Sequence, residues 1–372
     1  MRLVSPVDDI RAQALEVAAG WSPPDQPESW RLTAALFTMI AGHDELLASL
    51  SGLPPERMPA LLASAAVTYL VRAEPTPLSR YFPVAGRPQP TLDEDFGPAA
   101  VAFVSARLPD IMALCASHSY QMNEVARTAQ IALGIAAVHG QGPIGLIDLG
   151  TGAGLGLQLD RYRYEIDGQE TGPPTADLTL KCEARGDRKP PRPELPPIAK
   201  RAGIELNPVD LRDPAARAWL EACSPPEASA LTRLDLAIEV SREASAQIVV
   251  GDAVDALPGV LGSMPSDLPV LVTDAYLAVF LPAAGRAKLF SILSEASRRR
   301  PVTWLSLNPL VPLGPSGRDS VQGLAVPASL VADYQTDGVF AVLGARTFDR
   351  ATEGGTLLAR AHPSGLWVEW LV

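Results

Sequence analysis

A short apolar run ends in an acid and then meets glycines at alternate positions. The run Leu146–Leu149 contains Asp148, and glycines follow at Gly150, Gly152 and Gly154. Glycine lets the backbone approach a ligand closely, where any Cβ would collide. The spacing excludes the dinucleotide-binding Gly-x-Gly-x-x-Gly pattern, and the P-loop is excluded because no Lys-Ser or Lys-Thr follows. A ligand of another kind and a tight turn that binds nothing are the remaining possibilities.

The pattern of an acid and three evenly spaced glycines resembles motif I of the S-adenosylmethionine-dependent methyltransferases. In that family the loop passes beneath the methionine part of a nucleoside ligand that carries no phosphate. The resemblance therefore implies S-adenosylmethionine as the cofactor, bound by Asp148, Gly150, Gly152 and Gly154.

Three further acids stand at the ends of strand-like runs, in the order of the methyltransferase landmarks. The resemblance places Glu205 of "GIELNPVDL" on the ribose hydroxyls and Asp252 of "IVVGDAVDALP" on the adenine amino group. It places Asp274 and Tyr276 of "PVLVTDAYLAVF" beside the transferred methyl, as catalytic residues. Ligands of open α/β sheets bind outside the carboxyl ends of the strands. Each acid could instead cap a helix.

The second acid lies unusually far from the glycines. Such an acid usually follows the glycines by about 20 residues, whereas Glu205 stands 55 positions after Gly150. A proline-rich insertion at about 165–200 accounts for the excess and makes Glu165 and Asp167 rivals for the ribose. We prefer Glu205, because "GIEL" is typical of a strand and "YEIDGQE" of a turn. The insertion is expected to be a loop or ribbon over a sheet edge or a site, with a disordered linker as the alternative.

Polar residues repeat every three positions along Gln121–Arg127, within a helix predicted over 118–139. The functional interpretation is that Asn123 and Glu124 bind the substrate and that Arg127 grips a carboxylate near the glycine loop. A solvated stripe on the helix is the alternative.

Two tyrosines, Tyr162 and Tyr164, follow the glycine loop in the segment "DRYRY". They could form an aromatic wall of the substrate site. They could equally pack a helix end.

The chain divides into two parts by its hydrophobic pattern. Residues 1–140 are predicted to form a helical cap domain without strands. Residues 141–372 alternate apolar strands and helices, which predicts a mostly parallel Rossmann-like sheet. This sheet is expected to start at about Gly145 and to end in an antiparallel hairpin near 339–371.

The composition of the chain limits the classes of ligand and partner that it is expected to bind. The formal net charge of −11 argues against a general nucleic-acid or anionic-membrane surface. The three cysteines and four histidines are scattered, which gives no support for a metal site. We find neither a signal peptide nor an apolar stretch near the roughly 20 residues that span a bilayer. A soluble cytoplasmic protein is expected, and its oligomeric state is left open.

Several segments together resemble one bacterial family, domain of unknown function 2332, from about residue 10 to the end. They are "YQMNEVAR", the glycine loop, "DRYRY", "AGIELNPVDLRD", "GDAVDALP", "WLSLNPL" and "HPSGLWVEWL". Members usually carry Gln-Thr-Asn-Glu where this chain has Gln121-Met122-Asn123-Glu124. They often have a histidine where it has Thr273-Asp274. The family supports the fold and the location of the site and supplies no established reaction.

These observations predict an S-adenosylmethionine-dependent methyltransferase that acts on a small molecule. Methyl transfer from a sulfonium depends on in-line positioning and desolvation more than on acid–base chemistry. An enzyme of other chemistry on the same fold is one alternative. A non-catalytic binding or regulatory protein that retains the glycine loop is the other.

Overall fold

A computed structural model describes residues 5–22, 30–140, 142–242, 246–309, 320–337, 340–349 and 352–372. The chain forms two compact units. The helical unit comprises Met1–Glu124 and Val209–Asp235, and the sheet unit comprises Val125–Pro208 and Leu236–Val372.

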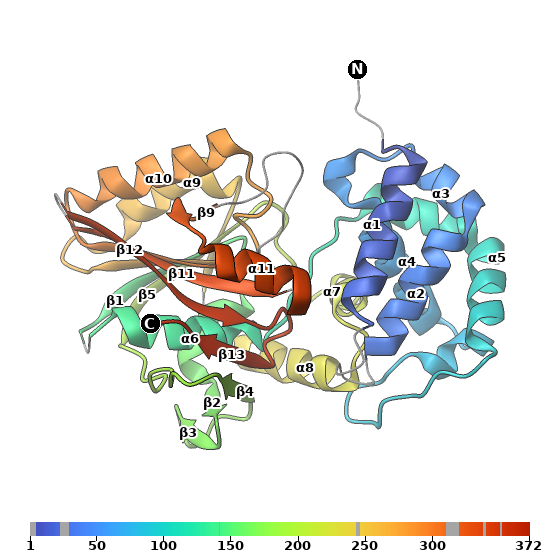
Figure 1. The fold of residues 1–372 in the computed structure, drawn as a ribbon, viewed down its shortest axis with the longest axis horizontal. Helices are drawn as coiled ribbons and strands as arrows, with labels where there is room; N and C mark the ends of the chain where they lie inside the picture. Colours follow the sequence, from blue (N-terminus) through green and yellow to red (C-terminus); the bar gives the residue numbers. More distant parts are fainter. Residues whose placement is uncertain are drawn as a thin grey trace. The chain divides into compact units, whose positions relative to one another are not determined.

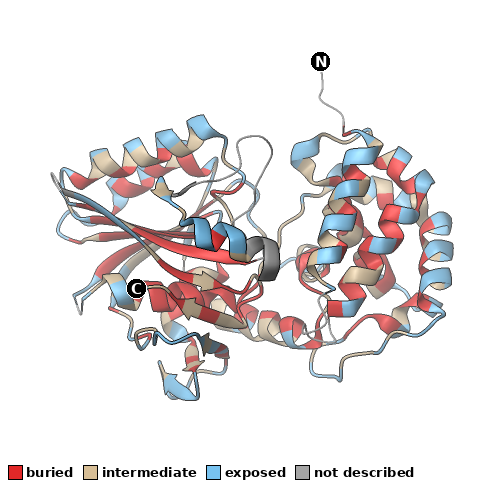
Figure 2. Cartoon of the chain, viewed as in Figure 1, coloured by how far each residue is buried: buried red, intermediate tan, exposed pale blue. Residues whose placement is uncertain are grey.

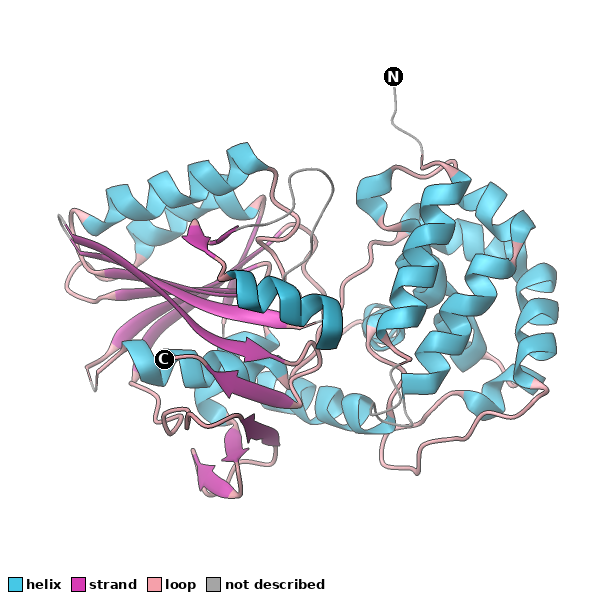
Figure 3. Cartoon of the chain, viewed as in Figure 1, coloured by secondary structure: helices cyan, strands magenta, loops and turns pink. Residues whose placement is uncertain are grey.

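The helical unit contains helices and no strand among its described residues (Figure 3). Its buried residues lie on the inner faces of these helices (Figure 2). The elements are α1 (Val7–Gly20), α2 (Trp30–Gly42), α3 (Asp44–Leu50), η1 (Pro55–Arg57), α4 (Pro59–Ala73), η2 (Pro77–Tyr81), α5 (Phe96–Ser117), α7 (Pro214–Cys223) and the first half of α8 (Ala228–Arg242).

The unit boundary differs from the expected boundary near residue 140, because α7 packs with the N-terminal helices. Trp219 and Cys223 of α7 belong to the same apolar core as α1 to α5. Arg72 of α4 forms a 2.8 Å ion pair with Glu221 of α7. Conversely, α6 (Arg127–Val138) packs on strands of the sheet unit.

The helix predicted over 118–139 was wrong in its first part, since α6 begins only at Arg127. Contacts with distant residues keep the segment after α5, residues 118–124, in a non-helical conformation. Arg57 donates to the carbonyl of Cys115 (2.7 Å) and to that of His118. The Trp219 indole donates to the Ser119 carbonyl (2.8 Å). These carbonyls are the ones that a continuing helix would need.

One helix among the described residues, α5, is long and apolar enough to cross a membrane by length and composition. This corrects the expectation that no such stretch exists. A core helix of a water-soluble protein meets the same criterion. Phe96, Ala100, Val104, Ile111 and Cys115 of α5 are buried in the core of the helical unit.

The sheet unit is built on a large, mostly parallel sheet in the order β3-β2-β4-β13-β12-β11-β8-β7-β1-β5-β6. The pairings among β8, β7, β1, β5 and β6 are all parallel, as the continuous apolar runs predict. The strands are β1 (Ile144–Leu149), β2 (Arg163–Ile166), β3 (Gln169–Thr171), β4 (Thr179–Arg185), β5 (Ile198–Glu205), β6 (Gln247–Val250), β7 (Val270–Ala275), β8 (Val302–Pro309), β11 (Ala341–Asp349), β12 (Thr352–Ala361) and β13 (Trp367–Trp370).

The chain reverses its direction across the sheet between β1 and β7. After β1 the chain first forms β2, β3 and β4 at the far end of the sheet, and it then forms β5 beside β1 and β6 beside β5. It next returns to β7 on the other side of β1. Open α/β sheets bind ligands outside the carboxyl ends of the strands at such a switch point. The helices α9 (Ala253–Ser263) and α10 (Ala283–Ser297) cover one face, and α6 covers the other (Figure 1).

The C-terminal strands confirm the predicted antiparallel end. β11 pairs antiparallel with both β8 and β12, and β12 pairs antiparallel with β13. The helix α11 (Ala328–Asp337) and a small pair of strands, β9 (Ser320–Val321) and β10 (Leu324–Ala325), precede them.

The proline-rich insertion supplies the far end of the same sheet. β2 and β3 form a hairpin whose turn contains Asp167 and Gly168, both with positive φ. β4 joins this hairpin to β13 by parallel pairing. The insertion is therefore a ribbon at a sheet edge, one of the two arrangements expected for it.

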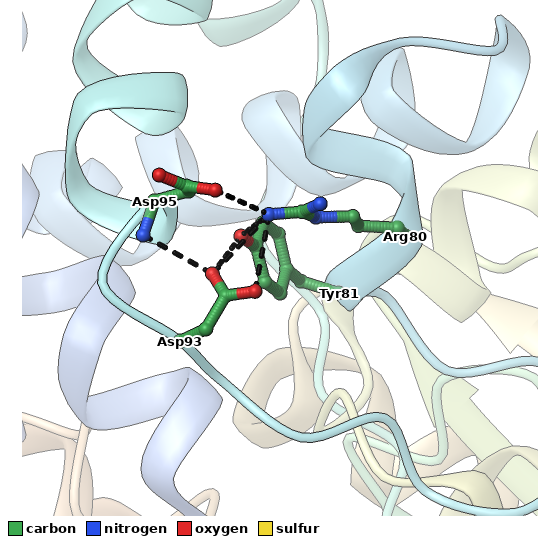
Figure 4. Close-up of polar contacts among 4 residues, drawn as sticks. All are labelled: Arg80, Tyr81, Asp93 and Asp95. Atoms are coloured by element: carbon green, nitrogen blue, oxygen red, sulfur yellow. Dashed lines mark hydrogen bonds and ion pairs between the residues drawn. The ribbon is translucent and has the colours of Figure 1, made fainter.

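A polar cluster in the helical unit lies between η2 and the start of α5 (Figure 4). The buried Tyr81 hydroxyl donates to Asp93, and Arg80 pairs with Asp93 and Asp95, each at 3.1 Å. The Tyr81 ring also packs edge-on against Phe96, with ring centroids 5.3 Å apart. The cluster joins η2 to the start of α5 and so closes the intervening loop.

Asp93→Asn should lower the melting temperature at neutral pH. The hydrogen bond from Tyr81 is the main cause that lowers the pKa of Asp93 below its usual 3.8. A lowered folded-state pKa stabilises the fold above the usual value, and this contribution is lost as the pH falls through the folded-state pKa. The difference between the variant and the wild type should therefore shrink from pH 7 to pH 3 in thermal melts. Asp95→Asn, at a more exposed position, is the control, and a pH-independent difference would contradict the account.

Candidate functional site

The glycine loop, Gly150–Gly154, has a backbone that glycine adopts most readily. Gly150, Gly152 and Gly154 have φ of +66°, +58° and +76°, in the left-handed region. The Gly150 N–H donates to the Ile204 carbonyl (2.8 Å), which fixes the loop on β5. A 3₁₀ helix, η3 (Leu155–Arg161), follows the loop.

Glu205, the last residue of β5, bonds directly to the glycine loop. One carboxylate oxygen accepts the Gly152 N–H (2.9 Å), and the other accepts the Asn207 N–H (3.0 Å). Glu165 lies on β2 and Asp167 in the β2–β3 turn, and β2 is separated from β1 in the sheet order by β4, β13, β12, β11, β8 and β7. Of the rival acids, Glu205 is the one at the loop.

Asp148 lies beside the loop among other carboxylates. Its Oδ1 accepts the Thr273 hydroxyl (2.7 Å). Burial is the main cause that raises the pKa of Asp148 to about 6; the charges of Asp274 and Glu205 also raise it, while the Thr273 bond lowers it. Such surroundings disfavour a further anion and favour a positively charged ligand.

Asp274 is fully buried and bonded to protein, which differs from the catalytic placement expected for it. Its Oδ1 accepts the Ala278 N–H (3.1 Å) and the Asn308 amide (2.7 Å), and its Oδ2 accepts the Trp304 indole (2.8 Å). Burial raises its pKa. With no exposed surface, this carboxylate fixes the turn after β7 against β8 and does not face an open site.

Tyr276 and Arg127 meet beside the glycine loop. Tyr276 has φ of +66°, a conformation that costs energy in a residue with a Cβ. The Arg127 guanidinium carbon lies 3.7 Å from the centre of the Tyr276 ring. Next to it, the Leu277 side chain lies 3.1 Å from the Cβ position that a side chain at Gly150 would occupy. The structure thus brings both predicted residues together with the loop.

The C-terminal turn holds Arg127 in place, a role that the sequence did not reveal. The Arg127 Nε donates to the Pro363 carbonyl (2.6 Å). Gln130, one turn further along α6, donates to the carbonyls of His362 and Trp367, each at 3.0 Å. A Cβ on Gly365 would lie 2.5 Å from the Ala126 backbone, so only glycine allows this close contact.

Asn123 and Glu124 do not lie on the polar helix flank that was predicted, because 118–124 is not helical. Glu124 is buried in a 3.1 Å ion pair with Arg233 of α8, within the helical unit. An amide N–H of Asn123 donates to the Gln121 carbonyl (3.4 Å). Their proximity to the glycine loop stays a prediction.

Asp252 caps the N-terminus of α9, which was the alternative to a ligand-binding role for this acid. One carboxylate oxygen accepts the N–H groups of Val254 (2.9 Å) and Asp255 (3.0 Å). Asp252 nevertheless remains exposed, two residues after the end of β6. It therefore lies at the same carboxyl edge of the sheet as Glu205.

Large apolar side chains are exposed along this edge. Leu206 follows β5, Val250 ends β6 and Phe280 follows β7, and each is at least 60% exposed. Glu205 and Val250 are directly paired in the sheet. Leu206 and Val250 therefore lie at the ends of neighbouring strands, and contiguous exposed apolar side chains are typical of binding surfaces.

Tyr162 and Tyr164 pack the interior, which was the alternative to a substrate wall. Both are fully buried, and their hydroxyls donate to the carbonyls of Leu155 (2.8 Å) and Leu159. Burial raises the pKa of each well above its ordinary value. Their hydroxyls are thus occupied by the backbone of η3.

One family model covers nearly the whole chain, including every residue of this site. A family model described as "Uncharacterized protein conserved in bacteria (DUF2332)" matches residues 9–370. The chain belongs to this family. Of the segments that suggested it, the one ending in Arg127, the glycine loop and the C-terminal turn meet around Tyr276 in this member of DUF2332. A comparison with curated proteins finds no match.

Asp148→Asn should stabilise the protein at pH 7 by up to about 3 kcal/mol. The pKa of Asp148 is raised from 3.8 to about 6 in the fold, so its contribution to stability is present below pH 3.8 and is lost as the pH rises through 6. Asparagine still accepts the Thr273 hydroxyl and carries no charge. Urea unfolding should show a gain at pH 7 that shrinks by pH 4.5. A variant less stable than the wild type at pH 7 would contradict this, and Asp267→Asn at an exposed position is the control.

Asp274→Asn should lower the free energy of unfolding by about 2–4 kcal/mol. Three donors converge on the two carboxylate oxygens, and an asparagine offers one oxygen and brings its own donor. Urea unfolding measures the loss. A change below about 0.5 kcal/mol, as for surface substitutions, would show that Asp274 does not hold the turn.

Proposed function

We propose that this protein is an S-adenosylmethionine-dependent methyltransferase that acts on a small molecule. The observation that carries the proposal is the bond from the Gly152 N–H to the Glu205 carboxylate. In nucleotide and dinucleotide sites, backbone N–H groups of such a loop receive a phosphate. Here a negative charge already occupies that donor, which favours a nucleoside ligand without phosphate at this position.

The residues around the loop fit such a ligand. The Glu205 oxygens can accept hydrogen bonds from two ribose hydroxyls. Exposed Leu206 and Val250 offer apolar surface for a flat base. The carboxylates near Asp148 favour the positive sulfonium, and Arg127 offers a cation for the carboxylate of the methionine part.

S-Adenosylmethionine supplies a methyl group on a positively charged sulfur, which makes the methyl electrophilic. The protein's own residues then have to orient the reactants and exclude water. The glycine loop and Glu205 orient the nucleoside. Tyr276, held by its N–H bond to the Leu307 carbonyl (2.8 Å) and by Arg127, forms a rigid wall for the acceptor.

A non-catalytic binding protein is the second candidate, and Asp274 is the observation that favours it. The acid near the end of β7 is fully buried, and its carboxylate oxygens accept hydrogen bonds from Ala278, Trp304 and Asn308 of the protein. An acceptor amine or hydroxyl would therefore reach the site without this carboxylate to orient or deprotonate it. Release of S-adenosylhomocysteine from S-adenosylmethionine in a small-molecule extract supports the enzyme. Binding without any release supports the second candidate.

Gly152→Val should abolish binding of S-adenosylhomocysteine, because its branched side chain enters the space of the ligand and opposes the left-handed backbone. Gly168→Val is the control: Gly168 shares the positive φ (+77°) but lies in the β2–β3 turn, with open space around its Cβ position. Calorimetric titration of both variants measures the effect, with melting temperatures to confirm folding. Equal affinity of folded Gly152→Val and wild type would exclude this loop as the cofactor site.

A further inference from the structure

The two helices on one face of the sheet enclose a groove that the proposed function does not use. The groove between α9 and α10 has a volume of about 390 Å³. Its lining starts at Pro258, in the second half of α9. Since α9 begins at the carboxyl end of β6, this half of the helix leads away from the glycine loop and toward the opposite edge of the sheet.

The floor of the groove is apolar and its rim is cationic. Leu261, Ile292 and Ala296 contribute to the floor, and Lys288, Arg299 and Arg300 stand around it. These cations gather on a chain whose formal net charge is −11.

The acids near the rim are already paired with cations. Glu295 pairs with Arg298 (3.0 Å), and Asp255 pairs with Lys288. Among the ion pairs of the described residues, none involves Arg299. The rim therefore keeps positive charge at the end formed by Arg299.

Arg300 adds a second positive charge beside Arg299, and hydrogen bonds hold its side chain in place. Its Nη1 donates to the carbonyls of Met264 (3.1 Å) and Pro265 (2.6 Å), just after α9. Arg299 and Arg300, which are adjacent in the chain, thus both line the groove. Guanidinium groups bind carboxylates by paired hydrogen bonds.

The groove is open because α9 has a glycine at its wall. A Cβ at Gly262 would meet no atom within 4 Å. The same holds for Gly259 on the same helix, which does not line the groove. The pair provides matched positions, one inside the groove and one outside it.

We propose that this groove binds a carboxylic acid with a single apolar chain, that is, a fatty acid. Its carboxylate lies at Arg299 and Arg300, and its chain covers Leu261, Ile292 and Ala296. The volume is within the roughly 300–1,000 Å³ of small-molecule sites, which combine apolar lining with a few placed polar groups.

The test is a calorimetric titration of the full chain with dodecanoate below its micelle concentration, with dodecanol as the uncharged probe. Wild type should bind dodecanoate saturably at one site and dodecanol at least tenfold more weakly. Gly262→Phe, which fills the groove, should weaken dodecanoate binding at least tenfold, whereas Gly259→Phe should leave it unchanged. Arg299→Ala should weaken dodecanoate binding about tenfold and leave dodecanol binding unchanged, and thermal melts confirm that each variant folds.

Three results would overturn the proposal. The first is the absence of saturable binding to wild type. The second is that folded Gly262→Phe binds dodecanoate as tightly as wild type, or that Gly259→Phe loses as much dodecanoate affinity as Gly262→Phe. The third is equal affinity for dodecanoate and dodecanol, which would remove the role of the arginines. None of these results depends on S-adenosylhomocysteine binding, so this proposal and the proposed function can fail separately.

Discussion

The bond between the Glu205 carboxylate and the Gly152 N–H couples the end of one strand to the loop that follows its neighbour. β1 and β5 are paired in register up to Leu149 and Ile204, so the loop and the acid start from fixed positions. Gly203 allows this approach, because a Cβ there would lie 2.4 Å from the Thr151 side chain. The arrangement of the candidate site depends on this junction, since it fixes which N–H groups and which charge face a ligand.

A second set of contacts positions the other side of the site. The buried Asp274 carboxylate holds the turn after β7, and this turn carries Tyr276 in its left-handed conformation. Arg127 covers the Tyr276 ring and is itself held by the Pro363 carbonyl. The last turn of the chain thereby supports a residue next to the first parallel strand. The contacts of α6 with the C-terminal turn therefore bear directly on the conformation of Tyr276.

The parallel strands could be predicted because buried strands are continuous apolar runs, and the glycines and Glu205 could be placed because they follow such runs. Other features depend on contacts between distant residues. The segment 118–126 has helical periodicity, but bonds from Arg57 and Trp219 take its carbonyls. The role of Asp274 is set by Trp304 and Asn308 on another strand. The support of Arg127 comes from a residue 236 positions away, and no local pattern encodes such a contact.

Hydrogen exchange of the backbone amides tests the central claim most directly, because it reports where a ligand binds without any substitution. The account predicts that S-adenosylhomocysteine slows exchange in peptides covering 148–157 and 203–208, the glycine loop and the residues around Glu205. The far hairpin of β2 and β3 should exchange at an unchanged rate. Exchange that is unaltered in both site peptides at saturating ligand, or slowed only elsewhere in the chain, would contradict the account.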